Sequence, residues 1–155
     1  MPGETLTIVV GAGGKGGSGG YPSGENGEEG GATLLIRSNN LHRLEVTGGE
    51  GGRGGGKGVN STAWGGEGGT VFPAADKARS ARGERAYRIY GGDGGAIPGF
   101  HTVIPRGGRK EGEDGASAFE PGAGGGGGAG SENGDKHGRG GAGGNGYVGI
   151  WYFLI

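Results

Sequence analysis

Hydrophobic residues occur mainly in short stretches at the two ends of the chain, and glycine-rich runs fill most of the space between them. Residues 5–10 alternate and are rich in β-branched side chains, which predicts a strand. Residues 32–36 and 42–47 flank a polar stretch at 37–40 and predict a β-hairpin. Residues 147–155 are the most apolar stretch and predict a buried strand, with residues 5–10 as its candidate partner.

The glycine runs repeat with a period of three. In residues 11–21, two of every three positions are glycine, and the third position holds Ala12, Lys15, Ser18 and Tyr21. Neither an α-helix nor a β-strand has this period, but polyproline II has three residues per turn. We expect the runs to form rods of this kind, which cover residues 11–20, 24–31, 48–58, 65–69, 91–95, 122–130 and 138–146.

The composition indicates that the interior of the fold consists mainly of backbone rather than of side chains. Glycine accounts for 49 of 155 residues and proline for 6, while only 30% of residues are hydrophobic. Collagen is excluded because its triplets are unbroken and its proline content is far higher. Polyproline II has no internal hydrogen bonds, so buried N–H and C=O groups need partners on neighbouring rods. The open alternative is a flexible low-complexity coil, which the recurring triplets argue against.

We therefore predict a mostly irregular and β fold: a bundle, or sandwich, of polyglycine II helices with a few short β-strands and long loops. Little or no α-helix is expected, and residues 1–155 form a single glycine-rich domain. The longest departures from glycine, residues 70–90 and 96–121, are predicted to be variable loops.

Chemistry-bearing motifs are weak throughout the chain. Residues 11–16 match G-x-G-x-x-G, but the glycine-rich continuation cannot form the helix that a dinucleotide site requires. No histidine has metal-ligand spacing, and cysteine is absent. A formal net charge of −1 gives no general attraction to nucleic acid. We expect a protein that is not an enzyme, with no cofactor, no metal, no nucleic-acid partner and no membrane insertion.

Four stretches of the chain resemble a known family. Residues 2–14, Pro-Gly-Glu-Thr-Leu-Thr-Ile-Val-Val-Gly-Ala-Gly-Gly, are similar to the opening of the glycine-rich domain at the ends of bacteriophage tail fibres. The similarity continues through residues 26–33 and 48–52, and it finishes at residues 143–148, Gly-Gly-Asn-Gly-Tyr-Val, where such domains close with a strand.

The resemblance implies an adhesin of the virion that acts at the host cell surface. Its expected receptor is a glycan or an outer-membrane protein, and its other partners are tail-fibre subunits, with a homotrimer as one possibility. The alternative is a structural virion protein, a capsid or tail decoration or an assembly module without receptor contact. From loop position and side-chain type, the expected receptor-binding residues are Trp64, Phe72, Arg79, Arg82, Arg85, Tyr87, Phe100, His101, Arg106 and Phe119.

Overall fold

The computed structural model of the chain describes residues 5–18, 24–37, 43–56, 69, 90–96, 102–131 and 136–150. These residues contain no helix. They form three strands: β1 (Leu6–Val9), β2 (Thr33–Arg37) and β3 (Arg43–Val46). The expected first strand and the expected hairpin are both confirmed, and the fold is mostly irregular with a small β component.

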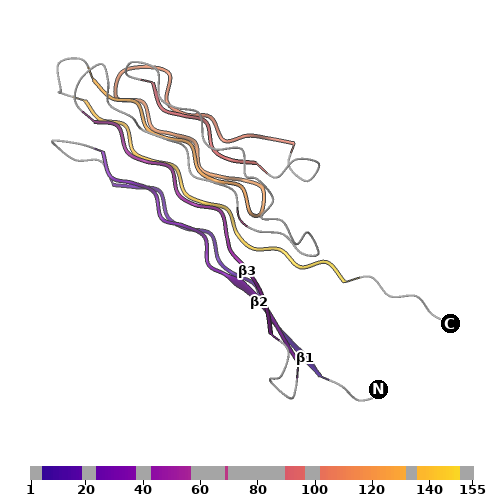
Figure 1. The fold of residues 1–155 in the computed structure, drawn as a ribbon. Coiled ribbons are helices and arrows are strands. Elements are labelled where there is room, and N and C mark those ends of the chain that lie inside the picture. The colour runs from indigo at the N-terminus through magenta and orange to yellow at the C-terminus, as the bar shows by residue number, and fades with distance from the viewer. Residues whose placement is uncertain are drawn as a thin grey trace.

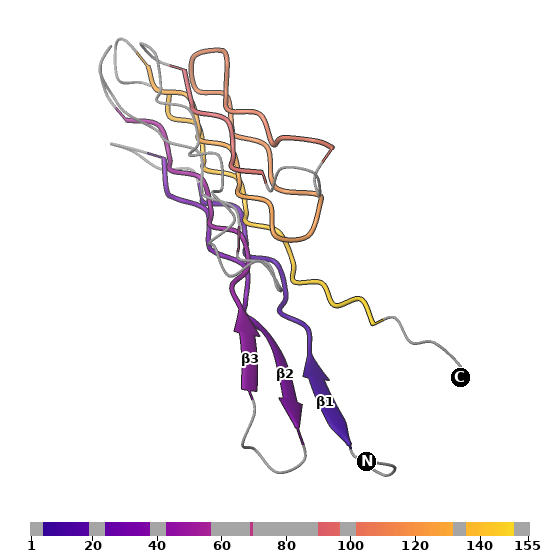
Figure 2. The ribbon, with the colours of Figure 1, turned by 45° about the vertical axis from the view of Figure 1, so that its right-hand side comes forward.

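The three strands form one antiparallel sheet in the order β1-β2-β3 (Figure 2). Ile8 faces Leu35, and Leu35 faces Leu44, so these three side chains share one face of the sheet. The aliphatic residues of β1 are 40–46% exposed. A single sheet layer has no second layer of its own to bury this face.

Beyond the sheet, the chain passes back and forth as extended segments that lie side by side (Figure 1). We call the end of the bundle next to the strands the sheet end, and the opposite end the turn end. At the turn end lie Ser18, Gly24, Tyr90 and the turn at residues 109–113. The extended segments cover residues 10–18, 24–32, 47–56, 90–96, 102–110, 113–118, 122–130 and 137–146.

Hydrogen bonds between the segments keep a strict spacing of three residues. Segment 137–146 shows the pattern, because successive backbone N–H groups donate in different directions. Its first series donates to segment 122–130, and its second series donates to segment 24–32 with bonds of 3.0 and 3.1 Å. The donors of the first series are Gly138, Gly141 and Gly144, and those of the second are Gly140 and Gly143. Each segment can thus bond to several neighbours at once, whereas a strand in a sheet bonds to two at most.

Segment 122–130 lies at the centre of the bundle. Residues 123–130 are all buried, and every one of them is glycine or alanine. Backbone hydrogen bonds connect the segment to six neighbours, namely segments 47–56, 90–96, 102–110, 113–118 and 137–146 and the single residue Gly69. A segment enclosed on all sides leaves no room for a side chain larger than a methyl group. The longest uninterrupted glycine run of the chain therefore occupies the most enclosed position.

The outer segments carry the larger third-position side chains of the triplets. Lys15 and Ser18 on segment 10–18 are exposed, and so are Glu50 and Arg53 on segment 47–56. The opposite edges of these segments are glycine because neighbouring backbones approach closely there. A Cβ placed on Gly14 would lie 2.0 Å from the carbonyl oxygen of Glu28.

Residues 147–150 differ from the predicted closing strand. They do not belong to the sheet, and β1 pairs with β2 alone among the described residues. Tyr147 is 55% exposed and Ile150 is 57% exposed, so the expected burial is wrong at these positions. Gly146 still donates to Gly11 at 2.8 Å, but the chain then diverges from β1 (Figure 2). The three-residue spacing of hydrogen-bond donors continues to Gly146, and residues 147–150 do not go on to form a strand.

The expected loop at residues 96–121 also differs in the structure. Residues 102–110 and 113–118 form two further segments of the bundle, joined by turns rather than by one long loop. Arg106 accepts a hydrogen bond from Ala116 at 2.8 Å, which ties the two segments together. Residues 97–101 of this expectation, and residues 70–89 of the expected loop at 70–90, lie outside the described residues.

The enclosure of segment 122–130 predicts that a single methyl group there disrupts the bundle. In Gly125→Ala, the new Cβ would lie 2.2 Å from the carbonyl oxygen of Gly141. We expect the free energy of unfolding, measured by urea denaturation, to fall by about 1–3 kcal/mol or more because overpacking forces backbones apart.

Gly16→Ala is the matched control, because its Cβ would meet nothing closer than 3.7 Å. This variant should gain about 0.4–1 kcal/mol from the reduced entropy of the unfolded chain. Equal effects of the two variants would contradict the central position of segment 122–130.

Candidate functional site

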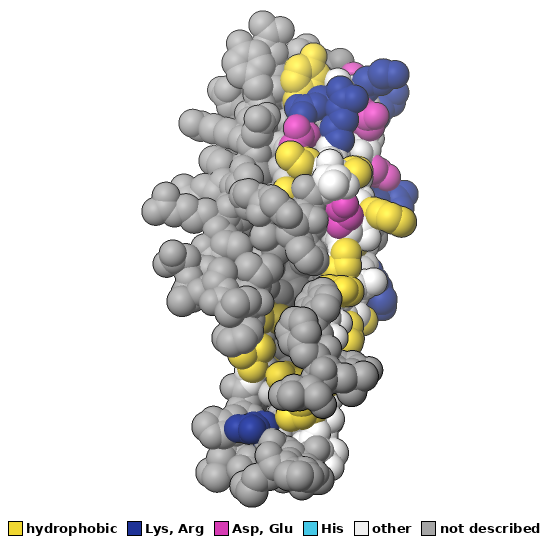
Figure 3. All heavy atoms as spheres, turned by 90° about the vertical axis from the view of Figure 1, so that its right-hand side faces the viewer, with side chains coloured by type: hydrophobic (Ala, Val, Ile, Leu, Met, Phe, Trp, Pro, Cys, Tyr) yellow, Lys and Arg dark blue, Asp and Glu magenta, His cyan; other side chains and the backbone are white. Residues whose placement is uncertain are grey.

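Charged side chains gather at the turn end of the bundle on the face shown in Figure 3. The turn at residues 109–113 stands at the centre of this group. Lys110 accepts a hydrogen bond from the N–H of Glu113 at 2.9 Å, and Gly112 between them has a φ of 70°. A positive φ at the third turn position is the conformation that glycine adopts without strain. Gly112 also donates to Gly130, which fixes the turn on the central segment.

The carboxylate of Glu113 closes this turn from outside. It accepts the backbone N–H groups of Arg109 at 2.6 Å and Lys110 at 2.8 Å. These two hydrogen bonds, with smaller contributions from the positive charges of Lys110 and Arg106, hold the pKa of Glu113 below its ordinary value of 4.5. Partial desolvation acts in the opposite direction and is the weaker effect. Glu113 is therefore ionised at neutral pH and bound to the turn.

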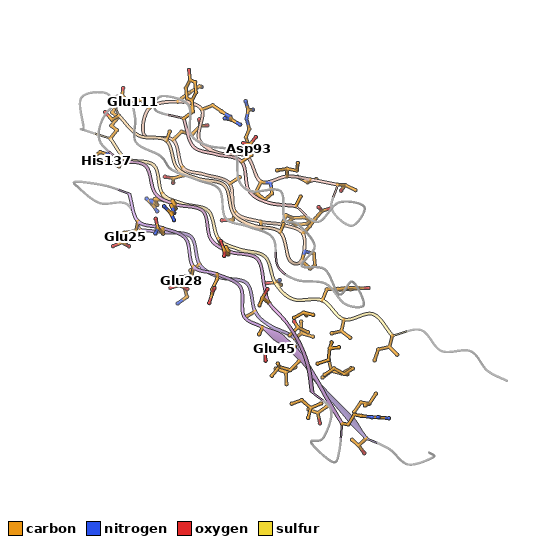
Figure 4. All side chains as sticks on the ribbon, in the orientation of Figure 1. Glu25, Glu28, Glu45, Asp93, Glu111 and His137 are labelled. Carbon is orange, nitrogen blue, oxygen red and sulfur yellow. The ribbon has the colours of Figure 1, made fainter. Side chains whose placement is uncertain are left out.

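The other acidic groups nearby are also engaged within the bundle. Asp93 accepts the N–H of Gly107 at 2.8 Å and pairs with the guanidinium of Arg109 at 2.5 Å. Arg109 also donates to the carbonyl of Gly91. Glu111 accepts a hydrogen bond from the hydroxyl of the buried Ser131. Figure 4 shows Asp93, Glu111 and His137 toward this end of the molecule.

A column of polar side chains completes the neighbours of segment 137–146. One series of its N–H groups faces segment 113–118, and side chains of that segment, rather than its carbonyls, accept those hydrogen bonds. Asp114 accepts the N–H of Arg139 at 2.8 Å, and Ser117 accepts the N–H of Ala142 at 3.1 Å. Because the two acceptors are three residues apart, they match the spacing of the donors.

Elsewhere on the surface, side chains also accept backbone hydrogen bonds in place of a neighbouring backbone carbonyl. The side-chain oxygen of Asn26 accepts the N–H of Gly54 at 3.0 Å. A carboxylate oxygen of Asp93 accepts the N–H of Gly107. These residues terminate the hydrogen-bonded array at its edges. Their polar side chains therefore have a structural role.

A second, apolar group lies at the sheet end. The carboxylate of Glu120 accepts the N–H groups of Thr102 and Val103 at 2.9 and 3.0 Å, which joins two segment ends. Beside it, Phe119 is 92% exposed, and Val103 and Ile104 are more than half exposed. The following turn has Gly122 at a φ of 78°. Pro121-Gly122 is a strong turn signal that the loop interpretation of residues 96–121 overlooked.

Two of the ten residues predicted to bind a receptor belong to the described part of the chain. Arg106 is exposed and lies close enough to Glu113 to influence its pKa. Phe119 is exposed at the sheet-end turn, so the structure does not assign the two residues to one turn. The remaining eight fall outside the described residues: Trp64, Phe72, Arg79, Arg82, Arg85, Tyr87, Phe100 and His101.

Sequence reasoning missed the structural roles of Asp114, Ser117 and Glu113, since it treated Glu113 and Asp114 as part of a solvated turn. Their signal is the three-residue spacing of Asp114, Ser117 and Glu120 beside the small residues Gly115 and Ala118. In the described ranges, no group of three or more His, Cys, Asp or Glu side chains is arranged to hold a metal ion. The same ranges hold no helix with the length and apolar character needed to cross a bilayer.

Comparison with known proteins yields no matching family model, no matching curated protein and no matching solved structure.

The side-chain acceptor column predicts a specific stability loss. In Ser117→Ala, the N–H of Ala142 loses its acceptor at a residue that is only 8% exposed. The free energy of unfolding should fall by about 1–3 kcal/mol, since an unsatisfied buried donor keeps its desolvation cost.

Ser18→Ala provides the control for this loss. The Ser18 hydroxyl bonds the exposed carboxylate of Glu25 rather than a backbone group. Its removal should change the unfolding free energy by less than about 0.5 kcal/mol. A Ser117 variant as stable as the Ser18 variant would show that water replaces the hydroxyl.

Proposed function

We propose that the extended segments are polyglycine II helices and that together they form a sandwich of such helices. Three features support this proposal: the hydrogen bonds recur every third residue, successive N–H groups donate in different directions, and segment 122–130 has six bonded neighbours. A two-fold strand cannot bond in so many directions, but a helix with three residues per turn can.

Backbone torsions measured by NMR in solution test this assignment. We expect residues 123–130 and 138–144 to have φ near about −75° and ψ near about +145°, the values of polyproline II. Amide exchange at Gly126 and Gly141 should be slow, because both glycines are buried and their N–H groups donate to backbone carbonyls. Torsions of ordinary β-strands, or amides that exchange freely, would contradict a polyglycine II interior.

We propose that the chain is the receptor-binding tip of a bacteriophage tail fibre, which attaches the virion to a host surface glycan or outer-membrane protein. The observation that carries this proposal is the base itself: a bundle tied by backbone hydrogen bonds, with its polar turns presented at one end. Groups held on a stiff base lose less conformational entropy on binding than groups on a mobile chain. The resemblance of residues 2–14 and 143–148 to tail-fibre tips supports the same function.

The two ends of the bundle expose different kinds of side chain, which suggests that they bind different partners. The turn end displays the charged groups around residues 109–113, and it faces away from both ends of the described chain (Figure 1). The sheet end carries exposed apolar side chains, including Leu6, Val10 and Tyr147. Exposed apolar surface of this kind is typical of protein interaction sites. We assign the turn end to the receptor and the sheet end to other virion subunits.

Competition for adsorption tests the receptor-binding function. The purified chain, added before phage, should occupy the receptor and reduce adsorption of the parent phage to its host. The Gly125→Ala variant is the control for folding and should compete poorly. Exchanging residues 70–89 for the equivalent segment of another tip should shift the range of strains bound.

Two outcomes separate this function from its alternative. Failure of the folded chain to bind any host strain, together with its location inside the particle, would favour a structural virion protein. The exposed apolar sheet end is compatible with that role as well. Binding to cells that the segment exchange leaves unchanged would instead move the contact surface away from residues 70–89.

A further inference from the structure

The acidic and basic side chains at the turn end have different roles. Each acid that the structure describes around the 109–113 turn is engaged within the bundle: Asp93 with Gly107 and Arg109, Glu111 with Ser131, Glu113 with two backbone N–H groups, and Asp114 with Arg139. The acids hold the turns in place. Their charges are turned toward donors of the protein itself.

Three cations at the same end have no such partner among the described residues. Arg106, Lys110 and Lys136 are all exposed and take part in no side-chain hydrogen bond or ion pair there. The structure brings them to one turn. Arg106 and Lys110 both act electrostatically on the Glu113 carboxylate, and a Cβ on Gly112 would lie 2.6 Å from Cβ of Lys136.

We infer that this turn binds anionic groups of a surface saccharide, through Arg106, Lys110 and Lys136. The inference rests on the proposed function for the source of the ligand, and it narrows the receptor to an acidic glycan. A guanidinium matches a carboxylate or phosphate with two donors, while each ammonium contributes a mobile point charge. The turn beneath them is fixed by Glu113 and by the bond from Gly112 to Gly130, so the three cations keep their spacing.

Neutral and basic ligands fit this surface less well. The described acids that would attract a cation, Asp93, Glu111, Glu113 and Asp114, already accept hydrogen bonds from the protein. A neutral glycan commonly binds by stacking on aromatic side chains. Among the described residues of the turn end, the exposed large hydrophobic side chain is Tyr90, which is 37% exposed. The free cations are therefore the strongest determinant of ligand chemistry at this end.

The test measures retention of the full chain on immobilised polysaccharides. Polygalacturonate presents carboxylates, phosphomannan presents phosphates, and neutral dextran presents neither. We expect retention on one or both anionic polymers, release by moderate salt because exposed charge pairs are screened, and no retention on dextran. The polymer that retains the chain more strongly identifies the anionic group.

Two double variants test whether retention depends on these cations or only on the total charge. K110Q/K136Q should weaken binding by about two- to thirtyfold, which corresponds to the loss of two exposed ion pairs. K15Q/R53Q removes the same charge from exposed residues on segments 10–18 and 47–56, and it should leave binding nearly unchanged. The unfolding free energies of both variants serve as the check on folding.

Two results would overturn the inference: equal losses in the two double variants, or retention on dextran equal to that on the acidic polymers. If the chain binds host cells but neither anionic polymer, the inference fails and the proposed function survives. If it binds neither cells nor polymers, both fail.

Discussion

The fold depends on pairing backbone N–H and C=O groups in an interior that contains almost no side chains. Burial of apolar area normally offsets the entropy of folding, but only alanines form the buried hydrophobic set among the described residues. Close approach of backbones takes the place of that core. Each glycine hydrogen atom allows a neighbouring carbonyl to approach within a distance that a methyl group would block, and dispersion and hydrogen bonding then act along every segment.

This constraint explains which parts of the fold the sequence predicts. Strand β1 and the β2–β3 hairpin follow from ordinary alternation, and the glycine runs follow from the period of three. The burial of segment 122–130 can also be traced to its residues, because a run without large third-position side chains suits a position with six neighbours. The number of larger side chains per triplet is thus a measure of exposure.

The parts that the sequence did not predict have a common physical cause. Segments 102–110 and 113–118 contain few glycine pairs, so they resemble loops when composition is the guide. They nevertheless belong to the bundle because their backbone groups bond to neighbouring segments at the same three-residue spacing, and Asp114 and Ser117 add side-chain acceptors at that spacing. Residues 147–150 show the opposite error. Their apolar character predicted a strand, but they do not pair with the described sheet. For the candidate site, sequence identified Arg106 as an exposed cation, but it could not show that the nearby acids are engaged within the bundle.

The positions of the two chain ends have a further consequence. The described chain enters the bundle beside β1 and leaves it near Tyr147, both at the sheet end (Figure 1). The eight described segments alternate in direction along the chain, so the first and the last of them both meet the sheet end. A change in length that adds or removes one pass would move the exit to the opposite end and place it among the turns. Related bundles of different thickness should therefore differ by whole pairs of passes, and their sequences should gain or lose triplet runs two at a time.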